Sequence, residues 1–397
     1  MNKIIYFIIC ALLFCMGVTT PHAATQTLSA CTEAAFDTAY AAASSGDTIA
    51  FPSGSCDISW SSQLTIAKTN LTISGEGSST SKFSGSQIFL VQNETANGLR
   101  IENIGFEGGS SAYGYIDTNI ESSGDVAIDG LVVYNCSFSM TGQQKVLLAQ
   151  AHVYGVFSNC TFTGGYPFYL LGSWSDDELG PSRPLTMGSD RGDDTLVIED
   201  SSFSVNNSNY GGAHIVVTND GFSWTIRYCT FDTSGYSASW HDFIDTHGTY
   251  FTPDRRGTFV FEFYENELTT NASPGHWTDL EGGQGVMYNN RSSSASLQIT
   301  VDEPADAYPS QDQIMYSGFW GNKHNCAGDM TDCSGGSSTG VGSDSSAVQL
   351  NRDYATTQAG FETLLGSSYT PYTYPHPLRG EGTETPANAI QGVSITP

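Results

Sequence analysis

The chain has 397 residues, with 41 acidic and 14 basic side chains and a formal net charge of −27. Binding to the phosphates of a nucleic acid needs lysine and arginine, so this balance excludes nucleic acid as the expected partner. An acidic surface keeps a protein soluble and can hold divalent cations, but most such carboxylates only contact water. After the first 20 residues, no run approaches the roughly 18 apolar residues of a membrane span, so we expect none.

The N-terminus has the pattern of a secretory signal peptide. Lys3 precedes the apolar run 4–18, and small residues follow at Ala23 and Ala24. The run is too short to span a bilayer comfortably, and small residues are typical of the cleavage site. We expect cleavage after Ala23 or Ala24 and take 1–23 as the signal peptide. The mature chain is then secreted, into the extracellular space or the periplasm.

Seven cysteines follow the predicted signal peptide. Cys31 and Cys56 lie near its end, and Cys326 and Cys333 flank a short polar loop. In an oxidising compartment both pairs are expected to form disulfides. Three cysteines remain, Cys136, Cys160 and Cys229. We expect them to be small buried side chains at equivalent positions of a sequence repeat. A disulfide between Cys136 and Cys160 is the alternative.

A short motif recurs along the chain and predicts a stack of coils. Its first copy is Asn103-Ile-Gly-Phe106, and further copies end at Phe138, Phe162, Phe203, Phe231 and Leu268. A fixed motif at irregular intervals of about 20 to 50 residues is typical of repeats that carry loops of varying length. Strand-forming residues precede each copy, and no segment after residue 50 keeps a helical period.

The geometry of a parallel stack gives each motif position a role. Equivalent residues of neighbouring coils lie about 4.8 Å apart, so each Phe is expected to stack on the next and fill the interior. Cys136, Cys160 and Cys229 share one interior position. Asn103 and its equivalents are expected at a corner, where Asn bends the chain and bonds backbone groups.

The sequence also predicts how the two ends of the stack are formed. Residues 31–43 are expected to form a short amphipathic helix that closes the N-terminal end, because an open repeat stack needs a cap. Its apolar side would consist of Ala34, Ala35, Phe36, Ala39, Tyr40 and Ala43. We expect one β-helix domain over 24–380 and a disordered tail over 381–397.

The sequence from this helix onward resembles the start of pectate-lyase-like right-handed β-helix proteins. The matching pieces are Gly46-Asp-Thr-Ile49 and Leu71-Thr-Ile-Ser-Gly-Glu-Gly77, followed by the repeated coils. It also resembles a group of secreted bacterial β-helix proteins of poorly defined function, through segments 244–248, 281–290 and 372–378. The resemblance implies an all-β fold, a single-stranded right-handed parallel β-helix. It also implies that the protein binds an acidic extracellular polysaccharide, and cleavage of that polysaccharide by a lyase reaction is the further expectation.

Three segments with histidines are candidates for the binding face. Aligning segments 213–217, 240–248 and 275–282 by their histidines places His214, His241 and His276 in one column. Trp240 and Trp277 flank this column and would stack on sugar rings. A one-residue slip of register would turn these side chains inward.

The resemblance also implies a lyase chemistry, in which Ca²⁺ neutralises a uronate and a base removes a proton. Carboxylates are suitable calcium ligands, and the candidates are Asp242, Asp245, Asp279 and Glu281. The candidate catalytic residues are Arg255, Arg256, Asp245 and His247. Arginine is normally fully protonated, so its use as a base needs special surroundings.

Three alternatives stay open at this stage. Paired carboxylates on nearby coils could hydrolyse a glycosidic bond. The histidine column could bind a metal, although histidines one coil apart would have to converge on the ion. The chain could also be a non-catalytic surface or matrix protein that binds glycan or protein along its length. The enzyme alternatives require an acid and a base in one groove.

Overall fold

The computed structural model describes residues 23–91, 96–109, 114–118, 128–142, 144–150, 153–165, 167–171, 195–204, 214–219, 222–234, 243–246, 258, 260–270, 277–294, 298–302, 308, 314–326, 330, 333–343 and 346–380. The predicted tail 381–397 lies outside these residues, as does the predicted signal peptide apart from Ala23. No helix in the described part is long and apolar enough to cross a membrane.

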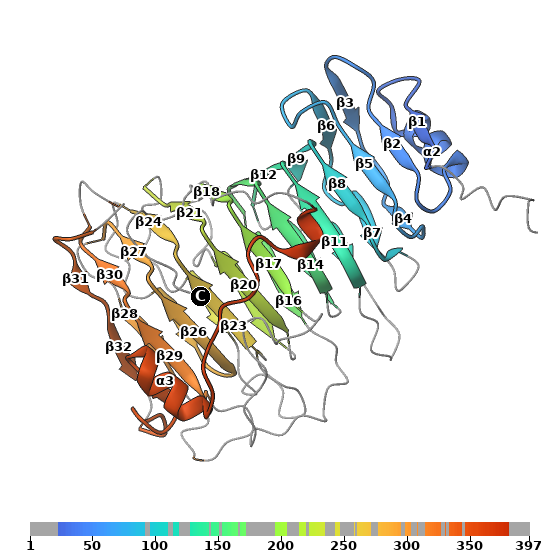
Figure 1. The fold of residues 1–397 in the computed structure, drawn as a ribbon. Coiled ribbons are helices and arrows are strands. Elements are labelled where there is room, and N and C mark those ends of the chain that lie inside the picture. Colours follow the sequence, from blue (N-terminus) through green and yellow to red (C-terminus); the bar gives the residue numbers. More distant parts are fainter. Residues whose placement is uncertain are drawn as a thin grey trace, which may run out of the picture.

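The described residues form three long sheets, and successive strands of the chain visit them in turn (Figure 1). Sheet A contains β1 (Thr25–Thr27), β2 (Thr48–Ala50), β5 (Thr72–Ser74), β8 (Arg100–Glu102), β11 (Ile128–Tyr134), β14 (Val153–Ser158), β17 (Leu196–Glu199), β20 (Ser223–Arg227), β23 (Val260–Tyr264), β26 (Gln284–Tyr288), β29 (Ser317–Trp320) and β33 (Tyr354–Ala355).

The other two sheets follow the same rule. Sheet B contains β3 (Cys56–Ser59), β6 (Ser81–Ser84), β9 (Gly105–Gly109), β12 (Ser137–Met140), β15 (Thr161–Thr163), β18 (Ser202–Ser204), β21 (Thr230–Asp232), β24 (Glu267–Thr269), β27 (Arg291–Ser292), β30 (Lys323–His324) and β31 (Ser337–Ser338). Sheet C contains β4 (Leu64–Ile66), β7 (Phe89–Val91), β10 (Gly114–Thr118), β13 (Lys145–Ala149), β16 (Phe168–Leu171), β19 (Val216–Asn219), β22 (Ile244–Thr246), β25 (Thr278–Leu280), β28 (Gln298–Val301) and β32 (Gly340–Ser343).

Neighbouring strands of each sheet pair in parallel, apart from the antiparallel pair β30–β31. The inner faces of all three sheets contribute to one continuous apolar core. This arrangement is consistent with the predicted parallel β-solenoid, in which each coil contributes one strand to each sheet.

The stack of motif aromatics forms as predicted. The rings of Phe106 and Phe138 are 4.8 Å apart and nearly parallel, and Phe138 stacks on Phe162 at 5.4 Å. Phe162, Phe203 and Phe231 continue the stack at 4.6 and 4.7 Å. The ring spacing follows the strand spacing, because each ring occupies the same position in successive coils.

The turn from sheet A to sheet B explains the motif's first residue. It has only two residues in each coil from β8 to β30, and the first of them is in the left-handed region: φ is 59° at Asn103 and 52° at Asn135. Asn tolerates this conformation better than most L-residues. Later coils place Asp200, Tyr228 and Glu265 there. The predicted corner is therefore confirmed.

The second residue of the same turn points inward and forms a mixed column. Strand register aligns Cys136 with Cys160, and Ser201 with Cys229. The three cysteines are buried and unpaired, so the small-side-chain interpretation is correct and the alternative Cys136–Cys160 bridge is wrong. From the next coil on, the column consists of Asn266, Asn290 and Asn322.

The predicted N-terminal capping helix is present, with Phe36, Ala39 and Ala43 of its predicted apolar side buried and Ala34 exposed. Helix α2 (Glu33–Ala42) begins at Thr32, whose hydroxyl accepts a hydrogen bond from the amide of Ala35. Phe36 is fully buried and contacts Trp60 and Phe83 edge-on. The helix therefore covers the first coil with its apolar side, and the Cys31–Cys56 disulfide ties its start to β3.

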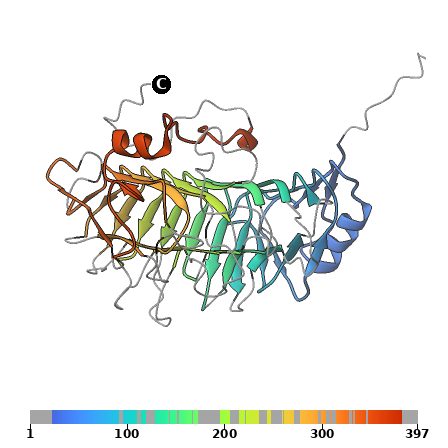
Figure 2. The same cartoon turned by 90° about the horizontal axis from the view of Figure 1, so that it is seen from below.

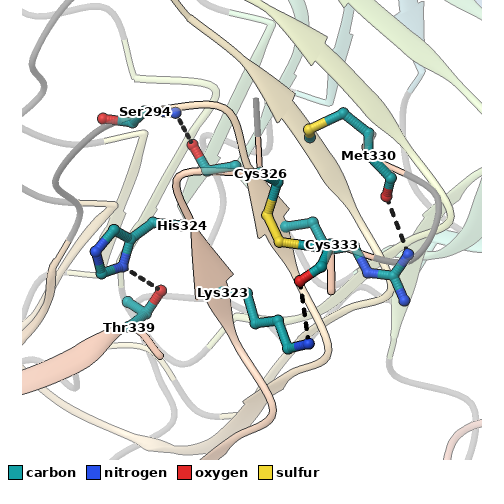
Figure 3. Close-up of a disulfide and its surroundings, with 9 residues drawn as sticks. Ser294, Lys323, His324, Cys326, Met330, Cys333 and Thr339 are labelled. Atoms are coloured by element: carbon teal, nitrogen blue, oxygen red, sulfur yellow. Dashed lines mark hydrogen bonds between the residues drawn. A yellow bond between two sulfur atoms is a disulfide. The ribbon is translucent and has the colours of Figure 1, made fainter. Parts of the chain in front are cut away.

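The C-terminal end carries the second predicted disulfide, Cys326–Cys333 (Figure 3). Two cationic side chains hold carbonyls of the loop that it closes. Lys323 Nζ donates to the carbonyl of Cys333 at 3.2 Å, and Arg291 Nη1 donates to that of Met330 at 3.0 Å. Both predicted disulfides are thus present.

After the last coil the chain turns back over sheet A. Helix α3 (Gln358–Leu365) packs on β29 and β33, and the short helix η4 (Pro377–Arg379) packs on β11 and β14. We call residues 366–380 the C-terminal strap. It runs along the outer face of sheet A, opposite to the chain direction of the stack (Figures 1 and 2).

Candidate functional site

The outer face of sheet C is the part of the stack with the longest connections at both of its edges. From β8 to β30, sheet A leads to sheet B through two residues, but residues 205–215 and 233–243 lie between consecutive strands of sheets B and C. Residues 172–195 and 247–259 lie between sheets C and A. Binding residues are concentrated on loops held by a rigid scaffold, which favours this face.

One column of residues on sheet C faces away from the core and contains three carboxylates. Strand register aligns Asp117 with Leu148, and Val217 with Asp245 and Asp279. Ile116, Ile244 and Leu280, which alternate with the aspartates along the strands, lie in the core. Because side chains alternate between the two faces of a strand, these aspartates lie on the outer face.

Asp245 and Asp279 occupy adjacent coils, about 4.8 Å apart along the stack. Nε2 of His214 lies 3.9 Å from Oδ2 of Asp245, and both side chains are largely covered, at 20% and 12% exposure. Glu281 follows the end of β25, and its amide donates to the carbonyl of Thr246. The structure thus brings four of the predicted residues to one region of sheet C.

Further along the same column, Asp117 is 2% exposed and accepts a hydrogen bond from Gln87 Nε2 at 3.1 Å. Lys145 lies nearby, and burial lowers its pKa although the charge of Asp117 opposes this change. Neither residue was predicted from the sequence. Aligning the strands that follow each motif would have placed Asp117 in the column of Asp245.

Trp277 does not form the predicted surface platform. Its side chain is 3% exposed, and its ring packs edge-on against Phe263 at 5.8 Å inside the core. The physical reason is strand phase. The amide of Phe243 donates to the carbonyl of Trp277, which places both aromatic residues at the same step of adjacent coils and on the inward side.

Of the predicted histidine column, the described part of the structure contains His214 alone, directly before Ile215, whose amide donates to the carbonyl of Phe243. The alignment of His214 with His241 and His276 therefore stays a prediction.

The remaining predicted site residues lie outside the described part of the structure. They are Trp240, His241, Asp242, His247, Arg255, Arg256 and His276. The convergence of an arginine with the carboxylates of sheet C therefore stays a prediction.

A calcium centre does not emerge from the side chains that are described. Ca²⁺ takes six to eight oxygen ligands, but among the described residues no three His, Cys, Asp or Glu side chains lie close enough to hold a metal ion. Among the described residues, Asp245 and Asp279 supply two carboxylates on adjacent coils, fewer oxygen ligands than a calcium ion takes.

A second polar cluster, unnoticed in the sequence, lies on the outer face of sheet A. Glu199 and Arg227 are paired in register on β17 and β20, and both are fully buried. Arg227 donates to Glu199 Oε2 from Nε at 3.0 Å and from Nη2 at 2.6 Å. They occupy the motif position before the left-handed corner, so aligning the repeats would have shown a Glu beside an Arg there.

The C-terminal strap completes this cluster. Nη1 of Arg379 donates to Oε1 of Glu199 at 3.0 Å and to Oδ2 of Asp200 at 2.6 Å. Burial opposes ionisation of Glu199, but the guanidinium groups of Arg227 and Arg379 outweigh it and keep the pKa of Glu199 below its usual value. The cluster is filled by the chain itself, and the face of sheet C remains the candidate site.

Comparisons of the sequence with protein-family models and curated proteins, and of the fold with solved structures, found no match.

Proposed function

We propose that the protein is a secreted, right-handed parallel β-helix that binds an extracellular polysaccharide along the outer face of sheet C. The observation that carries the proposal is the outward column of sheet C, which contains Asp117 and, beyond Leu148 and Val217, the adjacent pair Asp245 and Asp279. Right-handed connections are the rule for parallel strands of one sheet, and two disulfides suit an oxidising compartment.

The chemistry of the column suits a sugar polymer. A pyranose presents hydroxyl groups at its edge and carbon–hydrogen faces above and below the ring. Carboxylates are strong acceptors for hydroxyl donors. Asp245 and Asp279 lie on adjacent coils, about 4.8 Å apart, and the column continues along the stack, which favours an extended ligand over a compact one.

The charge of the protein bears on which polysaccharide binds. At −27 the chain repels polyanions unless cations intervene. An acidic polysaccharide therefore requires a cation bridge or the arginines at 255 and 256, whereas a neutral polymer requires neither. Binding therefore has to be measured with both acidic and neutral polysaccharides.

Cleavage by β-elimination is the second candidate. It is favoured by the placement of Asp245 and Asp279 on adjacent coils, with His214 beside Asp245. Products of such cleavage contain an unsaturated uronate that absorbs ultraviolet light. Incubation with uronate polymers, with and without Ca²⁺, would produce rising absorbance if the protein is a lyase, and a flat trace would leave binding alone.

The binding proposal is tested by affinity electrophoresis on a panel of neutral and uronate polysaccharides. The double variant Asp245→Asn/Asp279→Asn is expected to weaken binding at least about tenfold, since each charged hydrogen bond contributes roughly 1.5–3 kcal/mol. The matched control is Asp57→Asn on sheet B, which removes an exposed carboxylate that contacts Ser84. Equal binding by the double variant, or no binding to any polymer, would overturn the proposal.

A further inference from the structure

The C-terminal strap covers a surface that repeats along its length. On the outer face of sheet A, Tyr264, Tyr288 and Trp320 are in register and stack at 4.6 and 4.8 Å, with their rings almost parallel. Val132, Val156 and Val197 form a second repeating column under Tyr372. A segment that packs on such columns meets similar contacts after a shift of one coil, about 4.8 Å.

Apolar packing alone therefore does not fix where the strap lies. Tyr369 meets Tyr288 and Trp320 edge-on at the same 6.0 Å, which shows how alike neighbouring positions are. Register along a repetitive surface is set by features that occur once. On this face the charged pair Glu199–Arg227 occupies the column that continues as Tyr264, Tyr288 and Trp320.

The strap makes its directional contacts with that pair. Arg227 donates to Tyr264 Oη at 2.9 Å, to the carbonyl of Thr373 at 2.7 Å and to the carbonyl of Tyr372. Glu199 Oε1 accepts from the amide of His376 at 3.1 Å and from Arg379 at 3.0 Å. A shift of one coil would break all the contacts to the strap together.

The corner residue beside Glu199 extends the match. Oδ2 of Asp200 accepts from Tyr374 Oη at 2.8 Å and from Arg379 Nη1 at 2.6 Å. The buried carboxylate of Glu199 is thus paired with the guanidinium groups of both Arg227 and Arg379. A shifted strap would leave buried charges without partners, and breaking a buried pair is strongly destabilising.

We infer that the Glu199–Arg227 pair is a register key, which selects one position for the C-terminal strap on an otherwise repeating sheet face. The consequence concerns cooperativity. Coils of a solenoid contact only their neighbours, whereas the strap joins α3 on β29 and β33 to η4 on β11 and β14. Correct placement of the strap therefore links coils that do not touch one another.

Disulfide trapping can test the position of the strap. The rings of His376 and Tyr154 lie 5.2 Å apart, so His376→Cys with Tyr154→Cys should form a cross-link in the native register. Asp129 is paired with Tyr154 on the adjacent strand β11, so His376→Cys with Asp129→Cys reports a shift of one coil. With the key intact, we expect the first cross-link and not the second.

The key is then removed by Glu199→Gln with Arg379→Gln. If the inference is correct, this variant forms less of the native cross-link between positions 376 and 154. Either the shifted cross-link between positions 376 and 129 then appears, or neither cross-link forms. Hydrogen exchange should also become roughly tenfold faster or more in 366–380, since local opening controls exchange. Unchanged protection of β5 would show that the stack itself remains folded.

The matched control is Arg100→Gln, which breaks a more exposed ion pair with Glu102 on the same sheet. It should leave both the cross-linking pattern and the exchange of the strap as in the parent. If the Glu199→Gln/Arg379→Gln variant keeps only the native cross-link and full protection of the strap, apolar packing fixes the register and the inference is wrong.

Discussion

Nδ2 of Asn266 donates to Oδ1 of Asn290 at 3.0 Å, across adjacent coils in the interior of the stack. Asn290 repeats the same contact with Asn322 at 2.9 Å, and each Oδ1 also accepts from the backbone amide of the preceding Asn in the column. The asparagines take over the inward turn position that Cys136, Cys160 and Cys229 hold in earlier coils. This one column of the interior is thus lined mainly by small side chains in the earlier coils and by hydrogen-bonded asparagines in the later ones.

Asn290→Ala is expected to lower the free energy of unfolding by about 3 kcal/mol, because it leaves buried backbone and side-chain groups of Asn266 and Phe263 without partners. Urea denaturation measures this loss. Asn289→Gly is the control: it removes one hydrogen bond to Glu265 and suits the φ of 54°. Equal losses in both variants would show that the asparagine column adds nothing special.

Leu268 ends the phenylalanine stack and borders an apolar void with Phe231, Phe263 and Trp277. Leu268→Phe should continue the stack and raise the free energy of unfolding by about 1 kcal/mol, as cavity filling commonly does. Leu268→Ala should lower it by about 3 kcal/mol, because the void grows. Thermal unfolding compares the two variants. Destabilisation by Phe would instead mean overpacking and no usable space.

Glu199→Gln should destabilise the protein by about 3 kcal/mol at pH 7. The guanidinium groups of Arg227 and Arg379 would lose the buried carboxylate with which they are paired. The pKa of Glu199 in the folded chain lies below the ordinary value of 4.5. Its ionised form therefore stabilises the fold above that value, and the contribution is lost as the pH falls through the folded pKa. Denaturation at pH 7 and in acid should show a smaller acid-induced loss in the variant than in the parent.

Asp200→Asn should behave in the opposite way. Burial and the charge of Glu199 raise the pKa of Asp200, outweighing the hydrogen bonds from Tyr374 and Arg379. A raised pKa means that ionised Asp200 disfavours the fold once the pH exceeds the unfolded pKa, so a neutral amide removes this penalty. Asn also suits the φ of 51°. We expect stability at pH 7 to stay equal or rise by about 1 kcal/mol, and a loss as large as that of Glu199→Gln would contradict this reasoning.

The unpaired cysteines should not react while the protein is folded. Cys136, Cys160 and Cys229 are buried, and burial raises the pKa of Cys160 to about 12 against the effect of backbone hydrogen bonds. The thiolate is the reactive form. Mass spectrometry of a chain starting at residue 24 should show no alkylation in the native state and three labels after denaturation without reductant. Labelling of the native protein would show that the core opens locally.

The sequence by itself determined the local features of this protein. The left-handed turn at Asn103 and the stack from Phe106 to Phe231 were predicted from a motif that recurs in successive coils, and the cap at Phe36 was predicted from the helical pattern of one segment. Spacing was sufficient for both disulfides, since Cys31 and Cys326 each have a partner nearby in the chain. These features follow from contacts within one coil or between identical positions of adjacent coils.

Only the tertiary structure decided the features that depend on exact strand phase or on distant contacts. Strand phase buried Trp277, because alternate side chains of a strand face opposite ways and a position one residue away would have faced solvent. The pairing of Glu199 with Arg379 spans 180 residues and needs a strap that folds back over sheet A. No local pattern encodes such a contact, since it exists only after the stack has formed the surface on which the strap lies.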